Sequence, residues 1–354
     1  MNNSYSAESE IDQPLIPPVA PPKGWAFLSG TWTGRIILIN TIMFLISLWK
    51  SKSLGLLAID VNVLIDLGAK EPVLLAQGEY WRLFTPMFIH GGILHFGFNN
   101  WALYVLGYQI EHLLKPQRYL LLYFLAGIGG NLASALVSTS VSVGASGALF
   151  GLLGCGFYVE RSIQSKIKEL TGSKLRQGAY TGMVVANIIF GLMIPQIDNA
   201  AHIGGLIVGI TYAYVLLRLK PNRLLRQQPQ KALFVGAIVA LLFLGAGIIG
   251  SSPKWVHARL LSSVQSSETP QEKLFYLGRM IQLDPQDEMA RVHRLVISLQ
   301  LKQFDLASAD FLVLHSRGNY DQRMEEVASE LNQLGLFEAS EWLNQRLGAK
   351  DQSL

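Results

Sequence analysis

Charge is scarce in this chain, because Asp, Glu, Lys and Arg make up only 15% of its 354 residues, whereas apolar residues make up half. Soluble globular domains carry about 25% charged residues, so this composition excludes an ordinary soluble protein. Cysteine is scarcer still: the single Cys155 excludes an intramolecular disulfide. It falls within an apolar segment, where we expect a packed, unreactive thiol.

Long apolar runs are abundant instead, and a run of about 17 to 25 residues suffices for a transmembrane helix. Seven such spans are expected, at residues 35–49, 92–112, 118–138, 146–160, 179–196, 200–218 and 232–250. Residues 1–33, which contain several prolines, are predicted to be a disordered cytoplasmic tail without a cleavage site. The predicted fold is an all-α polytopic membrane bundle, with a six-helix core at 34–219 and a basic loop and seventh helix at 220–253.

Positive charge gathers in the loops after the second, fourth and sixth predicted spans. The basic residues of these three loops are, in order, Lys115 and Arg118; Arg161, Lys166, Lys168, Lys174 and Arg176; and Arg218, Lys220, Arg223, Arg226 and Lys231. The positive-inside rule assigns these loops to the cytoplasm, which puts the N-terminus inside and the C-terminal part outside. The expected location is a bacterial plasma membrane, with organelle membranes left open. Nucleic acid is not an expected partner, because no aromatic residues interleave with these charges.

Strongly polar side chains within a bilayer are costly and indicate function. Ser146 opens the fourth span in a Gly-Ala-Ser-Gly turn that begins at Gly144, and His202 opens the sixth span in an Ala-His-Ile-Gly-Gly run. His95 and Asn99 lie in the second span. The predicted topology brings all of them near the outer membrane face.

Ser146 and His202 suit one reaction, since histidine can take the proton of a serine hydroxyl near neutral pH. Glycines at 147, 151 and 154 in one span, and at 205 and 209 in the other, would let the two helices approach closely. Ordinary helix packing is the alternative explanation for the glycines alone. No acidic residue within the spans is placed to orient His202, and Asp198 precedes its helix, so we predict a dyad rather than a triad.

His95 and Asn99 lie one helical turn apart and could donate hydrogen bonds to a developing oxyanion, together with the backbone N–H of Ser146. The alternative for Asn99 is hydrogen bonding between helices. His90 and His95 invite a metal interpretation, but no His-Glu-x-x-His pattern is present. We therefore expect neither a metal nor another cofactor.

These residues, in this order, resemble the rhomboid intramembrane serine proteases over residues 79–210. The matching positions are Trp81-Arg82, His90, His95 with Asn99, Gly107 with Glu111, the turn from Gly144 to Gly147, and the run from Ala201 to Gly205. The resemblance implies that Ser146 is the nucleophile, that His202 is the general base and acid, and that His95 and Asn99 are oxyanion donors. Gly144, His90 and Phe150 would support them.

Family members carry an aromatic residue one turn after the serine, often tyrosine, that stacks on the catalytic histidine. Phe150 keeps the ring and lacks the hydroxyl, so no loss of activity is expected. The resemblance also implies a lateral loop at 50–77, a substrate gate at 183–193, and cleavage of single-pass membrane proteins in the lipid bilayer. A catalytically silent membrane adaptor on the same fold is the alternative function. A solute transporter would instead place polar residues at the bilayer midplane.

Residues 254–354 are charged and amphipathic and predict an extracytoplasmic helical domain, with breaks near Pro285 and at Gly318-Asn319. Phe304 and Phe337 lie in similar short segments, 33 positions apart. That interval is close to the 34-residue period of tetratricopeptide repeats, but a plain helical bundle fits two copies equally well. Such a domain is expected to recruit a protein partner or substrate, or to act only as a spacer.

Overall fold

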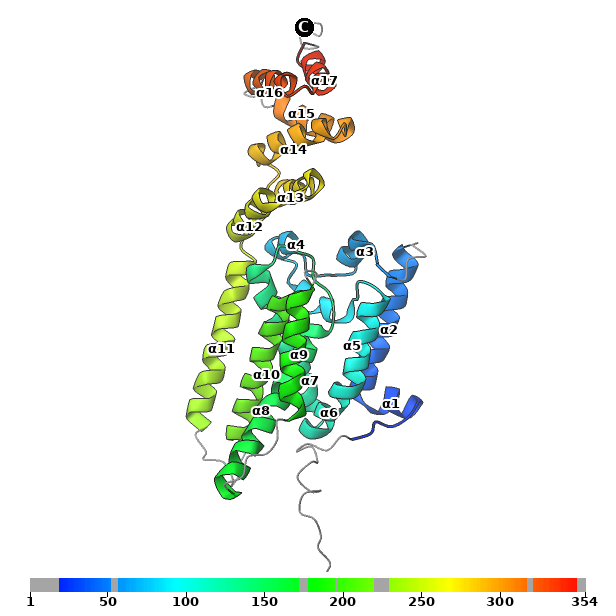
Figure 1. Ribbon diagram of the computed structural model, residues 1–354, viewed down its shortest axis with the longest axis vertical. Coiled ribbons are helices and arrows are strands. Elements are labelled where there is room, and N and C mark those ends of the chain that lie inside the picture. Colours follow the sequence, from blue (N-terminus) through cyan, green and yellow to red (C-terminus); the bar gives the residue numbers. More distant parts are fainter. Residues whose placement is uncertain are drawn as a thin grey trace, which may run out of the picture. The chain divides into compact units, whose positions relative to one another are not determined.

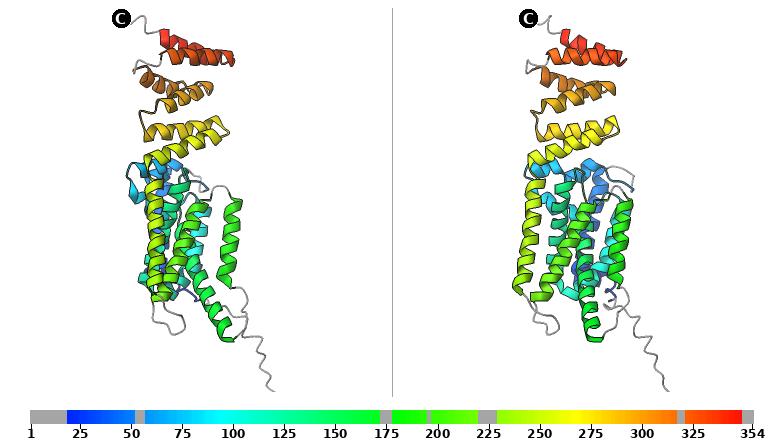
Figure 2. Two further views of the ribbon diagram at one scale, coloured as in Figure 1. Left: turned by 90° about the vertical axis from the view of Figure 1, so that its left-hand side faces the viewer. Right: turned by 60° about the vertical axis from the view of Figure 1, so that its left-hand side comes forward.

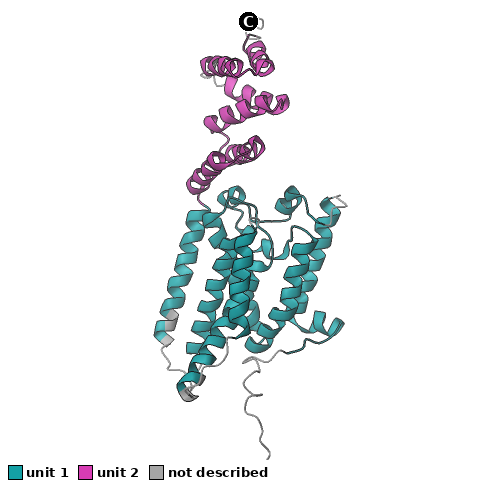
Figure 3. Cartoon of the chain, in the orientation of Figure 1, with its two compact units in different colours: residues 1–251 teal, residues 252–354 magenta. Residues whose placement is uncertain are grey.

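The computed structural model describes residues 19–51, 57–171, 178–194, 197–219, 229–316 and 321–348, and most of these are helical. The chain forms two compact units, Met1–Ser251 and Ser252–Leu354 (Figure 3). The all-α prediction is confirmed. Each unit has its own buried apolar cluster.

The first unit is a bundle of apolar helices that lie side by side (Figure 1). Its long helices are α2 (Trp32–Ser51), α5 (Ile93–Ala102), α7 (Pro116–Val137), α8 (Ser146–Thr171), α9 (Ala179–Met193), α10 (Asn199–Leu219) and α11 (Pro229–Gly250). A π-helical turn, η3 (Leu103–Gly107), joins α5 to α6 (Tyr108–Leu114). Short helices α3 (Val61–Asp66), α4 (Pro72–Ala76), η1 (Tyr80–Leu83) and η2 (Thr85–Phe88) connect α2 to α5.

Each predicted span coincides with a helix or a run of helices. Within the described residues, α2, α7 and α10 are individually long and apolar enough to cross a membrane, α11 meets the same test only together with the helix that follows it, and α9 is apolar but shorter. The limits of the fourth span were wrong, because α8 continues past residue 160 to Thr171. The residues after Arg161 are polar but form helices readily, so the helix outlasts the apolar segment.

The predicted disordered tail extended too far. Residues 1–18 lie outside the described part of the chain, but Trp25–Gly30 forms helix α1, and α2 begins at Trp32. Phe27 is buried, and its ring lies 5.2 Å from that of Tyr104. The start of α2 is also held, because both carboxylate oxygens of Glu111 accept backbone N–H bonds there, from Trp32 at 2.8 Å and Thr33 at 2.9 Å.

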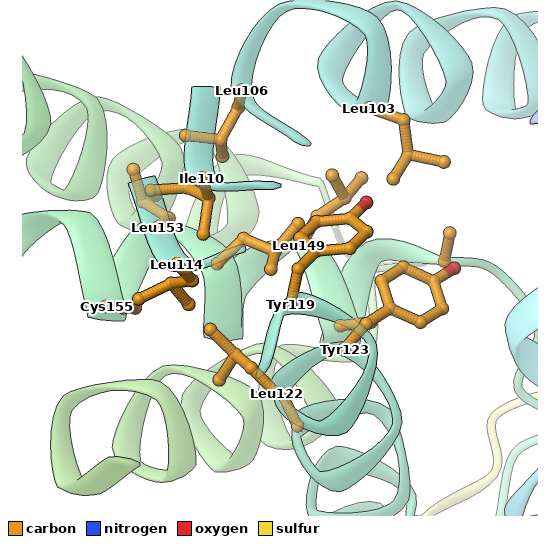
Figure 4. Close-up of a cluster of buried hydrophobic side chains, with 14 of the residues drawn as sticks. Leu103, Leu106, Ile110, Leu114, Tyr119, Leu122, Tyr123, Leu149, Leu153 and Cys155 are labelled. Carbon is orange, nitrogen blue, oxygen red and sulfur yellow. The ribbon is translucent and has the colours of Figure 1, made fainter. Parts of the chain in front are cut away.

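The core of the first unit lies between α6, α7, α8 and the π-helical turn η3 (Figure 4). Its fully buried side chains include Leu103, Ile110, Tyr119, Leu122 and Tyr123. Cys155 lies in the same cluster, and burial within apolar side chains makes a thiol unreactive. The core therefore fixes α7 and α8 beside each other, and α8 begins with Ser146.

Helices α8 and α10 approach each other through glycine. A Cβ atom on Gly205 would overlap the carbonyl of Gly147, and one on Gly209 would overlap the carbonyl of Gly151. A Cβ on Gly154 would come within 3.2 Å of the backbone nitrogen of Ile210. The close approach that these glycines were expected to permit is therefore present, and backbone meets backbone between the helices that carry Ser146 and His202.

The second unit consists of three helical pairs that follow one another (Figure 2). They are α12 (Pro253–Ser266) with α13 (Pro270–Leu283), α14 (Glu288–Gln300) with α15 (Phe304–His315), and α16 (Asp321–Gln333) with α17 (Phe337–Gly348). The second helices of the pairs begin at intervals of 34 and 33 residues. Three similar units at this interval are typical of a helical repeat. The predicted break at Gly318-Asn319 lies outside the described residues.

The repeat has a local cause in the turns. Lys302 and Gly335 both have positive φ, 57° and 76°, and each stands two residues before the phenylalanine that starts the next helix. The second unit is also held by a buried carboxylate: Asp310 on α15 accepts bonds from Arg294 at 2.7 Å and from Arg291 at 3.1 Å. These contacts stabilise the packing of α14 against α15.

Candidate active site

Ser146 is presented by a tight turn. Gly144 has φ of 122°, a conformation that favours glycine, and its N–H donates to the carbonyl of Pro86 at 2.8 Å. Helix α8 then begins at Ser146 itself. The first N–H groups of a helix have no partner within that helix. The turn therefore presents a hydroxyl and unpaired backbone donors at the same point.

His202 lies in the first turn of α10 and meets the serine directly. Its Nε2 lies 2.8 Å from Ser146 Oγ, which is hydrogen-bond distance. Both side chains are only partly buried, so the pair remains accessible. Among the residues that the structure describes, His202 Nδ1 has no hydrogen-bond partner. In this part of the chain the arrangement is a serine and a histidine, with no carboxylate hydrogen-bonded to the imidazole.

The ring of Phe150 packs against one face of the His202 imidazole. Its ring lies 4.1 Å from that of His202, centroid to centroid, at an interplanar angle of 15°. Phe150 lies one helical turn beyond Ser146 on α8 and is buried. The predicted stacking of this ring on the histidine is confirmed. The stack restricts rotation of the imidazole and keeps Nε2 directed at the hydroxyl.

His95 lies against the serine turn, on the side of Gly144. A Cβ atom on Gly144 would be 2.6 Å from His95 Nε2 and 3.7 Å from Ser146 Oγ, so only glycine leaves room for the imidazole there. His95 Nδ1 accepts the N–H of Gly91 at 3.5 Å. That bond leaves Nε2 as the nitrogen that faces the site.

Asn99 is placed less directly. It is buried one turn after His95, and its amide nitrogen donates to the carbonyl of His95 at 2.8 Å, within its own helix. Its side-chain oxygen has no partner among the described residues. That Asn99 points towards Ser146 therefore stays a prediction, and its basis is that Asn99 lies on the same face of α5 as His95.

His90 is fully buried behind these residues. Its ring lies 5.3 Å from that of His95 and 5.7 Å from that of Phe96, edge-on in both cases. His90 therefore supports the imidazole of His95. In the described part of the chain, no three His, Cys, Asp or Glu side chains are grouped as metal ligands.

A second polar group was missed by the sequence reasoning. Lys70, in the loop between α3 and α4, is fully buried, and its ammonium donates to Ser134 Oγ at 2.7 Å. Ser134 in turn donates to the carboxylate of Asp198, next to α10. No spacing in the sequence links these three residues, because they come from three distant segments.

Comparison with known protein families matches the part of the chain that carries this geometry. Residues 77–219, which include Ser146, His202, His95 and Asn99 but not Lys70, match the model of the Rhomboid domain family. The resemblance to the rhomboid family that the sequence predicted is thus confirmed for this part of the chain. The match ends at Leu219, the last residue of α10, so α11 and the second unit lie beyond the rhomboid domain.

Several curated relatives are similar to this chain. The chain is 32% identical over 283 residues to the protein named Rhomboid protease GluP of Bacillus subtilis, which covers 78% of this chain and 52% of that protein. It is 35% identical over 195 residues to RHOMBOID-like protein 5 of Arabidopsis thaliana, covering 52% of this chain and 59% of the relative. Rhomboid-like protease 1 of Toxoplasma gondii is 32% identical over 185 residues, covering 50% and 60%. The chain thus spans about half the length of the curated relatives it matches.

Proposed function

We propose that this chain is an intramembrane serine endopeptidase, with Ser146 as nucleophile and His202 as general base and acid. The 2.8 Å approach of Ser146 Oγ to His202 Nε2 carries this proposal. Two relatives with the same domain are named as proteases, which supports it. Both side chains stand at the starts of apolar helices, where a membrane-embedded peptide could reach them.

The reaction follows from the chemistry of the pair. Ser146 Oγ forms a bond to the peptide carbonyl carbon while His202 Nε2 takes its proton. As the C–N bond breaks, the same proton passes to the leaving amine and an acyl-enzyme remains. Water then attacks the ester with His202 again as base, which releases the new carboxyl end and restores Ser146.

The oxyanion of that reaction needs donors that are already in place. We assign this role to His95 Nε2, to Asn99 and to the backbone N–H of Ser146. An amide nitrogen has two N–H groups, so Asn99 keeps one to donate while the other is bonded to the His95 carbonyl. Gly144 contributes by leaving space for the His95 ring, and His90 by packing against it.

The proposed substrates are single-pass membrane proteins with a weak helix near the outer face. A helix covers its own carbonyls with backbone hydrogen bonds, so a peptide bond must be unwound before Ser146 can attack. The distribution of basic loops favours a plasma-membrane protein with a cytoplasmic N-terminus and an external second unit. The helical pairs of that unit are suited to recruiting a protein partner.

The experiment compares purified wild type with Ser146→Ala and His202→Ala on a single-pass substrate that has a small residue and a glycine or proline in its outer segment. We expect a cleavage product with wild type only, read on a gel. Both variants must remain monodisperse with unchanged helicity, so that a lack of cleavage reflects loss of the catalytic side chain and not misfolding. If folded wild type leaves several substrates intact in detergent and in lipid, the membrane-adaptor function replaces this proposal.

A further inference from the structure

Lys70 is a buried charge that the proposed reaction does not use. Its side chain has no exposed surface, although a buried unpaired ion loses several kcal/mol of hydration. Its ammonium donates to Ser134 Oγ on α7 at 2.7 Å and interacts electrostatically with the carboxylate of Asp198. Ser134 bridges the two charges, because its hydroxyl donates to Asp198 Oδ2. Lys70, Ser134 and Asp198 therefore form one connected buried polar group.

Asp198 connects this group to the proposed base. Its other carboxylate oxygen accepts the N–H of Ala201 at 3.0 Å, and its backbone carbonyl accepts the N–H of His202 at 3.2 Å. Asp198 thus caps the first turn of α10, where the carboxylate also satisfies one of the unpaired N–H groups of the helix. The direction in which α10 presents His202 depends on this cap.

Lys70 also connects the group to the proposed nucleophile, through its backbone. Its N–H donates to the carbonyl of Ser142 at 3.0 Å and its carbonyl accepts the N–H of Ser142 at 3.0 Å, which forms an antiparallel bridge. The Ser142 side chain interacts with Asp198 as well. Ser142 stands two residues before Gly144, so the bridge anchors the turn that presents Ser146.

Building on the proposed function, we propose that Lys70 and Asp198 are positioning residues that hold the Ser146 turn and the His202 helix in register. Neither residue touches the reacting atoms. The backbone of Lys70 holds the turn before Ser146, and its side chain holds the start of α10 through Ser134 and the carboxylate of Asp198. Displacement of a reacting group by 1 Å can cost about 10²-fold in rate. Loss of the pair is therefore expected to slow the chemical step rather than weaken substrate binding.

The test uses Lys70→Met, Asp198→Asn and the double variant in the full-length protein. Lys70→Met keeps the backbone bridge, and Asp198→Asn keeps an oxygen for the Ala201 cap. Each single variant leaves one buried charge without its partner, whereas the double variant leaves none, so its effect should be smaller than the sum. Measured quantities are kcat, KM and the rate at which a fluorophosphonate labels Ser146, which reports alignment of the dyad without a bound substrate.

We expect each single variant to lower kcat and the labelling rate by about 10-fold or more, with KM within about twofold, because alignment and not binding is lost. The double variant should recover at least about threefold of that loss if the charges act as a pair. Asp310→Asn is the matched control, because it also removes a buried carboxylate that is paired with arginines, but in the second unit. It should leave kcat unchanged.

Failure of the proposed function and failure of the positioning role give different results. A wild type that neither cleaves nor takes the label refutes the proposed function itself. An active wild type with variants that keep full kcat, that change only KM or thermal stability, or that show no recovery in the double variant refutes the positioning role. If Lys70→Met does not fold, Asp198→Asn alone decides between a loss of kcat with unchanged KM, as expected, and no change in kcat, which overturns the proposal.

Discussion

At the scale of single residues, the contacts of His202 are asymmetric. Nε2 faces Ser146, one face of the ring lies on Phe150, and Nδ1 has no hydrogen-bond partner within the described residues. In a Ser-His-Asp triad a carboxylate would orient the imidazole through Nδ1. Here that orienting role falls to the stack with Phe150 and to the backbone of α10. The stack is therefore the contact whose loss should be felt first.

Phe150→Leu should lower kcat/KM, whereas Phe150→Tyr should keep it close to that of wild type. An aromatic pair contributes about 0.5–1.5 kcal/mol beyond its buried area, which corresponds to a loss of about 2- to 10-fold for leucine. Cleavage kinetics with one substrate measure both variants. Full activity of Phe150→Leu would mean that the packing around α10 orients His202 without the ring.

The sequence predicted the candidate residues of this site but not the residues that hold them in place. Ser146 and His202 stood out because a strongly polar residue at the start of an apolar span is conspicuous, and the resemblance to a known family added Phe150. The structure brings the three together. Lys70 did not stand out, and Asp198 was considered only as a partner for the imidazole of His202, because a buried pair joined across three segments has no period or spacing in the chain. The hydrogen bond from the Asn99 amide to the His95 carbonyl could not be predicted from the sequence either, since it depends on the rotamer of Asn99.

At the scale of elements, the contact between α8 and α10 determines how close the two proposed catalytic side chains can be. The helices meet where Gly205 faces the Gly147 carbonyl. The glycine spacing predicted this contact, because only small residues permit such an approach. The sequence did not predict where α8 ends, since the polarity that marks the membrane boundary does not stop a helix.

Gly205→Val should separate these helices and abolish substrate cleavage. Its Cβ would meet backbone, which cannot rotate away, and overpacking costs about 1–3 kcal/mol. We expect loss of cleavage together with a lower unfolding temperature. Gly245→Ala on α11 is the matched control, because nothing lies within 4 Å of its added methyl group. It should keep activity, and equal activity of Gly205→Val would contradict the packing argument.

The turns of the second unit allow an opposite pair of changes. Lys302 has φ of 57°, a conformation that costs a non-glycine residue roughly 1–2 kcal/mol, and its ion pair with Glu338 is exposed. Lys302→Gly should therefore stabilise α14–α17, and Gly335→Ala should destabilise them. Hydrogen exchange of the amides in α15 and α17 measures both effects. Slower exchange in the first variant and faster exchange in the second is the expected result, and no change in either would refute it.

At the scale of the whole molecule, two compact units meet in sequence between Ser251 and Ser252. The site and the rhomboid domain lie entirely in the first unit. The sequence indicated the change in composition near this point and two of the repeated turns. It missed the pair formed by α12 and α13, because no Lys302-like or Gly335-like turn precedes α13, where Ser252 and Thr269 cap the two helices instead.

A chain that ends at Ser251 should keep the chemical step. The first unit contains its own apolar core and every proposed catalytic residue, so labelling of Ser146 by a fluorophosphonate should proceed at the rate of the full-length protein. A higher KM for a folded protein substrate, with unchanged kcat, would assign recruitment to the second unit. A shortened chain that is helical and monodisperse but no longer labelled would show that the units act together.

The glycine contact between α8 and α10 also bears on thermal motion. Side chains between two helices explore rotamers and can transmit their disorder to the groups nearby, but glycine has no rotamers to explore. Where Gly205 meets Gly147, the separation of the helices is set by peptide groups alone. The spacing of the two backbones that carry Ser146 and His202 is therefore set by rigid peptide groups, and warming should leave that spacing unchanged until the bundle itself opens.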